Sequence, residues 1–320
     1  MSTSAINPCS FGIESGNSSA FTNDPLVASL SKTFEYKDEL RQAGYCLLSG
    51  VLAKDDCDQA IESLWDFYED VSNGTASRLN PFSGKDNGTY PSQGLFSGFG
   101  AGWVLGGTRQ VLAAKIFEPL FGTGKLWSSK EGFRLIATHS EEQESYRVLP
   151  VPTYHETPTI YIRALIVLAT GTASQLNCNL VLSNQREQQE FPNQVVELSR
   201  GDVLLFRSDI HVEEEYPDMA DCTKYTDCPA VAYCTMHPTP PPGTESSNTK
   251  QKCWDLKIEA YKERRTGTYQ VGTECSMPPV GTIGRCYYRT NPPIVSKRLA
   301  ELYGLLPYDS DDPQEDRKRA

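Results

Sequence analysis

The chain has 320 residues, of which 38% are hydrophobic and 10% aromatic, enough for one large packed core. The formal net charge of -11 and the pI near 5.0 lack the basic surface that nucleic-acid binding needs, so we expect no nucleic-acid partner. The chain has no apolar run long enough for a membrane span and no secretory signature, which predicts a cytoplasmic protein with no membrane segment.

The N-terminal half shows mainly helical patterns. Residues 1–24 are rich in Ser, Asn and Gly and are expected to form a mobile arm. Helical spacing is predicted for residues 26–43, a short buried strand for 44–50, and a helix that begins at Asp55. A long loop rich in Gly and aromatic residues follows over 73–106, and residues 108–120 predict an amphipathic helix that ends before Gly122.

The C-terminal half changes to short runs of β-forming residues. Strands are predicted at residues 132–137, 159–169, 176–183, 194–198, 202–206 and 230–236. Six short strands separated by polar turns predict a sandwich or barrel, so the fold class is mainly β with flanking helices (α+β). Helices are expected at 253–265 and 294–305. We expect one domain over 25–308 and a charged tail over 309–320.

The order of several sequence segments resembles the phytanoyl-CoA dioxygenase-like family of iron(II)/2-oxoglutarate oxygenases. The segments are 44–52 with the helix after Asp55, 126–133, 161–183, 201–211 and 231–238, which together run along most of the chain. The resemblance implies a double-stranded β-helix (jelly-roll, cupin-like) core. It also implies Fe(II) and 2-oxoglutarate as cofactors and a small organic molecule as substrate.

By position, the resemblance makes His155 and His211 the two histidines of the iron site and the candidate catalytic residues. Such a site needs two imidazoles and one carboxylate on one face of the metal. Here Thr157 stands at the carboxylate position, and strand alternation would turn Glu156 to the opposite face. The family's basic residue for 2-oxoglutarate corresponds to the uncharged stretch 228–230.

Other residues could complete the site. His139 and Glu141 form a second H-x-E triplet, and Glu213 follows His211 closely, so these three are alternative metal ligands. The acidic run 213–215 itself predicts a solvated turn. Arg163, Arg207 and Lys224 could replace the missing basic residue. The residues expected to line a substrate or cosubstrate pocket are Trp103, Tyr161, Arg163 and Arg207.

Three functions remain open from the sequence. The first is an iron(II)/2-oxoglutarate oxygenase that hydroxylates or otherwise oxidises a small organic substrate. The second is a metal-independent pseudo-oxygenase that binds a ligand, or catalyses an acid–base rearrangement, in the same cavity. The third is a non-catalytic interaction protein that uses the Pro-rich segment 238–243. The oligomeric state is not predicted.

Overall fold

The computed structural model describes residues 36–72, 76–81, 94–96, 101–129, 131–136, 145–147, 162–182, 194–208, 210–216, 224–238 and 295–308. The predicted arm at 1–24, the tail at 309–320, the helix at 253–265 and residues 239–243 of the Pro-rich segment lie outside these residues. Within the described part of the chain, no helix is long and apolar enough to cross a membrane.

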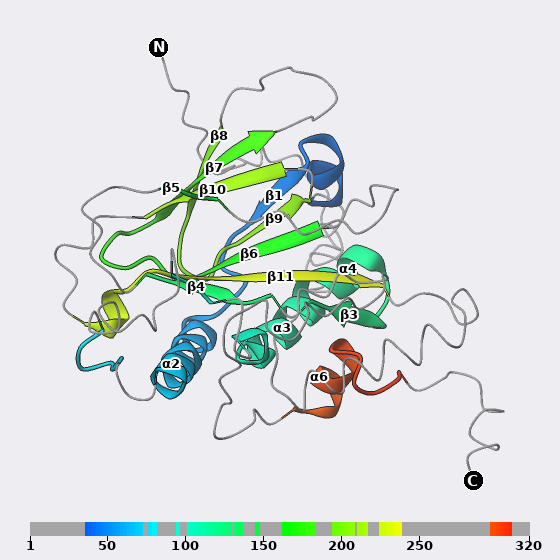
Figure 1. Ribbon diagram of the computed structural model, residues 1–320. Coiled ribbons are helices and arrows are strands. Elements are labelled where there is room, and N and C mark those ends of the chain that lie inside the picture. The colour runs from blue at the N-terminus through cyan, green and yellow to red at the C-terminus, as the bar shows by residue number, and fades with distance from the viewer. Residues whose placement is uncertain are drawn as a thin grey trace, which may run out of the picture.

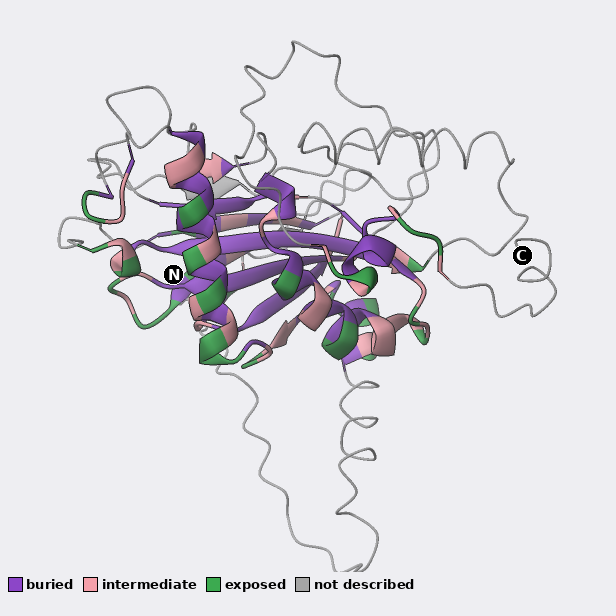
Figure 2. Ribbon diagram, turned by 90° about the horizontal axis from the view of Figure 1, so that it is seen from below, coloured by how far each residue is buried: buried purple, intermediate pink, exposed green. Residues whose placement is uncertain are grey.

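Helix α2 (Lys54–Val71) covers one face of the larger sheet. Its first turn is stabilised by the Asp56 carboxylate, which accepts a hydrogen bond from the Ala53 N–H at 3.1 Å. Apolar residues recur three and four positions apart, and the side that carries Leu64, Trp65 and Tyr68 is buried. Figure 2 shows the exposed residues of α2 on the side away from the strands. The helix predicted after Asp55 is therefore confirmed.

The predicted helix at 108–120 is also present, but it is not regular. It consists of α3 (Gly106–Leu112), a π-helical turn (Ala113–Phe117) and α4 (Glu118–Phe121). Gly122 ends it in the left-handed conformation with φ 69°, as its place after the apolar pattern predicts. Near the C-terminus, α6 (Lys297–Leu302) lies within the predicted helix at 294–305.

The strands among the described residues form two antiparallel sheets. The larger sheet has the order β1-β9-β6-β11-β4-β2, and β3 also pairs with β11. The smaller sheet has the order β5-β10-β7-β8. The strands of the larger sheet are β1 (Tyr45–Leu48), β2 (Leu95–Phe96), β3 (Leu126–Ser128), β4 (Phe133–Leu135), β6 (Ile162–Ala169), β9 (Val203–Arg207) and β11 (Ala230–Pro238). Those of the smaller sheet are β5 (Ser145–Arg147), β7 (Leu176–Leu182), β8 (Gln194–Leu198) and β10 (Ile210–Glu215).

The chain crosses repeatedly between the two sheets. From β4 in the larger sheet it passes to β5, back to β6, on to the β7–β8 pair, back to β9, on to β10 and finally to β11. This alternation is the winding of a double-stranded β-helix, in which two Greek keys close around one interior. The predicted fold class is confirmed, as are the strand predicted at 44–50, which is β1, and the six strands predicted for the C-terminal half.

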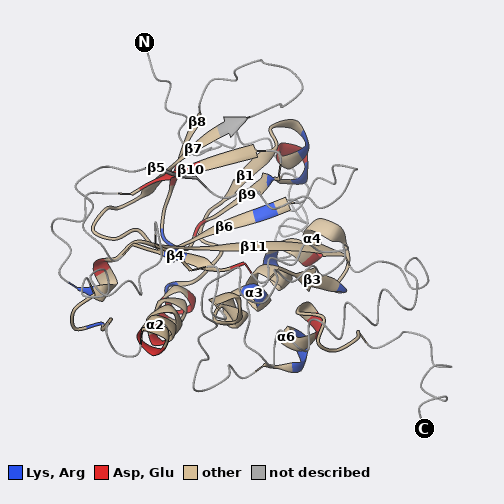
Figure 3. Cartoon of the chain, in the orientation of Figure 1, with Lys and Arg blue, Asp and Glu red and all other residues tan. Residues whose placement is uncertain are grey.

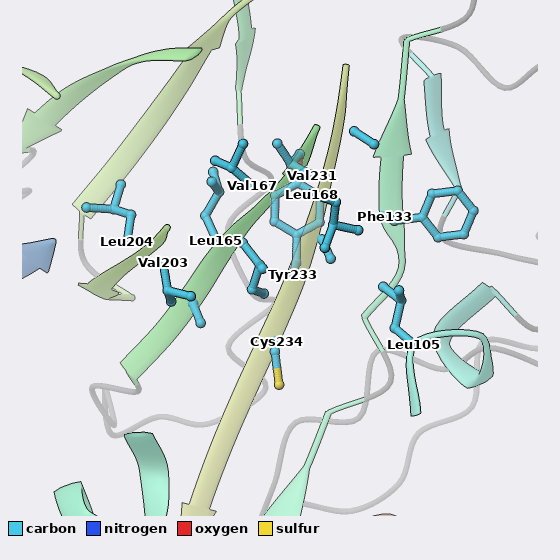
Figure 4. Packing of buried hydrophobic residues seen from close by; sticks show 14 of the residues in the cluster. Leu105, Phe133, Leu165, Val167, Leu168, Val203, Leu204, Val231, Tyr233 and Cys234 are labelled. Atoms are coloured by element: carbon cyan, nitrogen blue, oxygen red, sulfur yellow. The ribbon is translucent and has the colours of Figure 1, made fainter. Parts of the chain in front are cut away.

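The pairing register decides which side chains face the barrel interior. On β11, Tyr233 lies opposite Leu165 of β6, which in turn lies opposite Leu204 of β9. These side chains occupy the face toward the smaller sheet, and Figure 4 shows part of their packing. The opposite face carries Phe133, whose ring lies 5.8 Å from that of Phe67 on α2. Both faces of the larger sheet are thus covered, which explains why β6 and β11 are apolar almost throughout.

One interpretation of the sequence is wrong. The acidic run at 213–215 is not a solvated turn but the second half of β10, paired with β7 on one side and β5 on the other. Its middle residue, Glu214, is fully buried. A run of three carboxylates is unusually polar for a strand, yet alternation leaves only one of them in the interior.

Candidate functional site

Within the described part of the chain, two buried ionic clusters lie inside the barrel. The first is centred on Glu214, whose carboxylate accepts hydrogen bonds from Arg134 at 2.6 Å and from the Tyr233 hydroxyl at 2.6 Å. The Tyr216 hydroxyl donates to the same carboxylate. The side chains of Arg134 and Glu214 are 1% and 0% exposed. Because β4 and β11 belong to one sheet and β10 to the other, this cluster joins the two sheets through the interior.

The second cluster lies where β6 begins and β11 ends. The Glu131 carboxylate receives three donors, namely Arg163 at 2.7 Å and the hydroxyls of Ser129 and Thr235 at 2.8 Å each. Arg163 lies directly opposite Thr235 in the register, on the same face as Tyr233. Its guanidinium carbon is 5.7 Å from the centre of the Phe206 ring. Figure 3 shows a single basic patch on β6, which is Arg163.

Arg109 of α3 supports this second cluster from behind. Its Nε donates to the Ser129 carbonyl at 3.1 Å, and its Nη2 donates to the Glu131 carbonyl. The side chain is almost fully buried. Arg109 therefore holds the backbone on both sides of the Glu131 carboxylate, and Glu131 in turn holds Arg163.

The electrostatics of both clusters favour fixed charges. Burial alone would raise the pKa of Glu131. The attraction of Arg163 and the hydrogen bonds from Ser129 and Thr235 outweigh burial, so the pKa of Glu131 is lowered from its usual value. Burial and the charge of Glu214 hold the pKa values of Tyr216 and Tyr233 well above their usual range. Glu131 is thus ionised, and Tyr216 and Tyr233 are protonated, at neutral pH.

The register places His211 away from the interior. His211 pairs with Val181 and alternates with Ile210 and Val212, which are buried on the core side. It therefore lies on the outer face of the smaller sheet, the face that also carries Glu213. Its predicted partners His155, His139 and Glu141 lie outside the described residues, so the predicted metal site as a whole stays a prediction.

The predicted pocket residues separate into different places. Arg163 lies in the interior cluster. Arg207, at the end of β9, lies on the opposite face from Phe206 by strand alternation, so the register does not bring it to Arg163. Trp103 packs edge-on against Tyr303 with ring centroids 4.8 Å apart, in a small cluster next to α6. Tyr161 lies outside the described residues.

The carboxylates and thiols in the interior of the described part of the chain have other surroundings than a metal ion. Within them, no group of three His, Cys, Asp or Glu residues could hold a metal ion. The two interior carboxylates, Glu131 and Glu214, are each bonded to an arginine and to two hydroxyl donors. The five described cysteines, which include Cys228, are buried thiols.

Reasoning from the sequence missed Glu131, Arg134 and Glu214. A signal for Glu214 was available, because it stands two positions after Val212 on the apolar face of a strand with period two. A carboxylate on such a face predicts a buried cationic partner. Nothing local distinguished Glu131, which follows a polar segment and precedes β4.

Comparison with known proteins gives structural similarity only. No family model matches the chain, and no curated protein matches it significantly. Among solved structures, similarity is found to the non-heme alpha ketoglutarate dependent epimerase SnoN from nogalamycin biosynthesis, with a TM-score of 0.42, 13% identity and coverage of 68% of this chain and 92% of SnoN.

Two further solved structures show the same level of similarity. A Pseudomonas putida prolyl-4-hydroxylase has a TM-score of 0.33 and 13% identity, covering 65% of this chain and 100% of that one. HygX from Streptomyces hygroscopicus, solved with nickel and 2-oxoglutarate, has a TM-score of 0.37 and 13% identity, covering 64% and 87%. At such identities only the fold is compared, and the site rests on this chain's own residues. By its own strand order, the chain is a double-stranded β-helix protein.

Proposed function

We propose that this protein is a metal-independent pseudo-oxygenase that binds a small organic molecule inside the β-helix, at the end where Arg163 lies. The observation that carries the proposal is the Glu131–Arg163 cluster. A buried guanidinium, fixed by a salt bridge of 2.7 Å and placed over the Phe206 ring, is oriented before any ligand arrives. Preorganised arginines suit carboxylate groups, because their planar donors match two oxygens.

The titration behaviour of the interior favours binding over acid–base catalysis. A general acid or base works best with a pKa near the operating pH. Instead, the pKa of Glu131 is lowered, whereas burial raises those of Tyr233 and Tyr216. Burial also raises the pKa of Cys234 to about 11. These interior groups hold or orient a molecule better than they transfer a proton.

The test measures binding of small carboxylates to the full chain after treatment with a chelator. Titration calorimetry with 2-oxoglutarate and succinate as probes should give a measurable affinity that iron does not change. Arg163→Gln should weaken this affinity at least about tenfold, because a charge-assisted hydrogen bond is lost. Arg200→Gln is the matched control, since Arg200 pairs with Asp58 at the surface and should leave binding unchanged.

Two outcomes would overturn the proposal. One is the absence of binding for every carboxylate in the chelator-treated protein, and the other is equal affinity in the wild type and in Arg163→Gln. Circular dichroism of each variant would show whether the fold is intact, so that a folding defect is not mistaken for a binding defect.

The iron(II)/2-oxoglutarate oxygenase is a second candidate, and one observation favours it. Strands β5 and β10 are antiparallel neighbours, with Arg147 opposite Glu213. Strand β5 therefore runs toward the end of β10 that carries Ile210 and His211. Anaerobic addition of iron(II) and 2-oxoglutarate would then produce a visible charge-transfer band, and oxygen would yield succinate. Both signals together would replace the metal-independent proposal.

A further inference from the structure

The C-terminal segment, residues 295–308, packs closely on the helices beside the barrel. The hydroxyl of Tyr303 donates to the Gly102 carbonyl at 3.1 Å, and its ring lies edge-on to Trp103. Leu299 of α6 fills the space beside Gly106, where an added Cβ would lie 2.4 Å from the Leu299 Cδ2. A larger residue at position 106 would therefore require the Leu299 side chain to move.

The same segment is also anchored at the beginning of β3. Arg298 donates to the Glu118 carboxylate at 2.5 Å and to the Gly124 carbonyl at 2.9 Å. The Tyr308 hydroxyl accepts the Leu126 N–H at 3.0 Å and donates to the Leu126 carbonyl. Two sets of polar contacts therefore tie residues 295–308 to the strand that leads directly to the Glu131 cluster.

A continuous series of contacts connects the segment with Arg163. Leu299 holds the start of α3, and the same helix carries Arg109. Arg109 binds the carbonyls of Ser129 and Glu131, and the Glu131 carboxylate binds Arg163. Each step is a packing contact or hydrogen bond between buried or partly buried groups.

We infer that the C-terminal segment is a positioning element of the Arg163 cluster. When residues 295–308 are docked, Arg109 keeps the Ser129 and Glu131 carbonyls in place, and Glu131 keeps the guanidinium of Arg163 in its orientation. Release of the segment loosens this arrangement. The part of the inference that concerns a ligand rests on the proposed function. A molecule bound at Arg163 then favours the docked state of residues 295–308, and docking of these residues strengthens binding by the same factor.

Hydrogen exchange of the full chain tests the inference without any ligand. The variant Leu299→Ala removes the contact with Gly106, and Lys297→Ala is the matched control on the exposed side of α6, where the Lys297 side chain is 63% exposed. Leu299→Ala should speed exchange in peptides covering 126–136, which include the Ser129 N–H bonded to the Thr235 carbonyl. Peptides from α2 should keep their protection, which shows that the protein remains folded.

The outcomes separate the inference from the proposed function. The inference is supported if hydrogen exchange over 126–136 is faster in Leu299→Ala but not in Lys297→Ala, and if Leu299→Ala also binds carboxylates about tenfold more weakly. Unchanged exchange over 126–136 in Leu299→Ala overturns the inference, even if carboxylates bind the wild type tightly. If the wild type binds no carboxylate, the proposed function fails, and the exchange result alone decides whether the segment positions the cluster.

Discussion

Replacing Glu214 by Gln tests the most deeply buried charge in the described part of the protein. The substitution keeps the size of the side chain, and the amide oxygen can still accept from Tyr216 or Tyr233. It removes the negative charge that lies 2.6 Å from Arg134. Because Arg134 is itself almost fully buried, its guanidinium would remain in the interior without its anionic partner.

The expected cost follows from this burial. Removal of one member of a buried ion pair destabilises a protein by about 3–5 kcal/mol, since the other charge stays desolvated. Folded domains are stable by only about 5–15 kcal/mol, so Glu214→Gln should remove a large part of the total. With a denaturant slope of about 3 kcal/mol per molar urea, the unfolding midpoint should fall by about 1 M or more.

The neighbouring carboxylate provides a matched control. Glu213→Gln removes the same charge one residue earlier, on the outer face of β10. For Glu213→Gln we expect the free energy of unfolding to change by less than about 1 kcal/mol, as for partly exposed ion pairs. Urea unfolding followed by circular dichroism measures both variants. Equal midpoints for Glu214→Gln and Glu213→Gln would refute the reasoning, because β10 would not present Glu214 to the interior.

Three further predictions concern other parts of the fold. Because the pKa of Glu131 is lowered in the folded protein, its ionisation adds stability above the unfolded pKa of about 4.3. This stability is lost as the pH falls through the folded pKa. The free energies of urea unfolding of wild type and Glu131→Gln should therefore differ more at pH 7 than below pH 4. Gly201 has φ 87°, and an added Cβ would lie 2.5 Å from the Leu52 carbonyl oxygen, whereas Gly50 at φ 63° has open space. Gly50→Ala should lower the free energy of unfolding by about 1–2 kcal/mol, and Gly201→Ala should lower it clearly more. Equal losses in the two variants would argue against the close contact at Gly201. Burial and a hydrogen bond with Glu39 raise the pKa of Cys46, so mass spectrometry should show it reacting with iodoacetamide far more slowly in the native protein than in urea.

The sequence by itself determined most of the elements. The helical spacing after Asp55 identified α2, because burial of one helix face requires apolar residues three and four positions apart. The apolar runs at β6 and β11 identified strands that are covered on both faces. These patterns are local, so they can be recognised without knowledge of the partners.

Only the tertiary structure decided the chemistry of the interior. Glu214 is a buried ion because Arg134, eighty positions away in the chain, faces it from the other sheet. His211 lies on the outer face because successive residues of a strand point to opposite sides, so a register that buries Val212 turns His211 outward. Strand pairing joins distant segments, and no local pattern specifies its register to a single residue. The sequence therefore determined the β-helix, whereas pairing decided which side chains meet inside it.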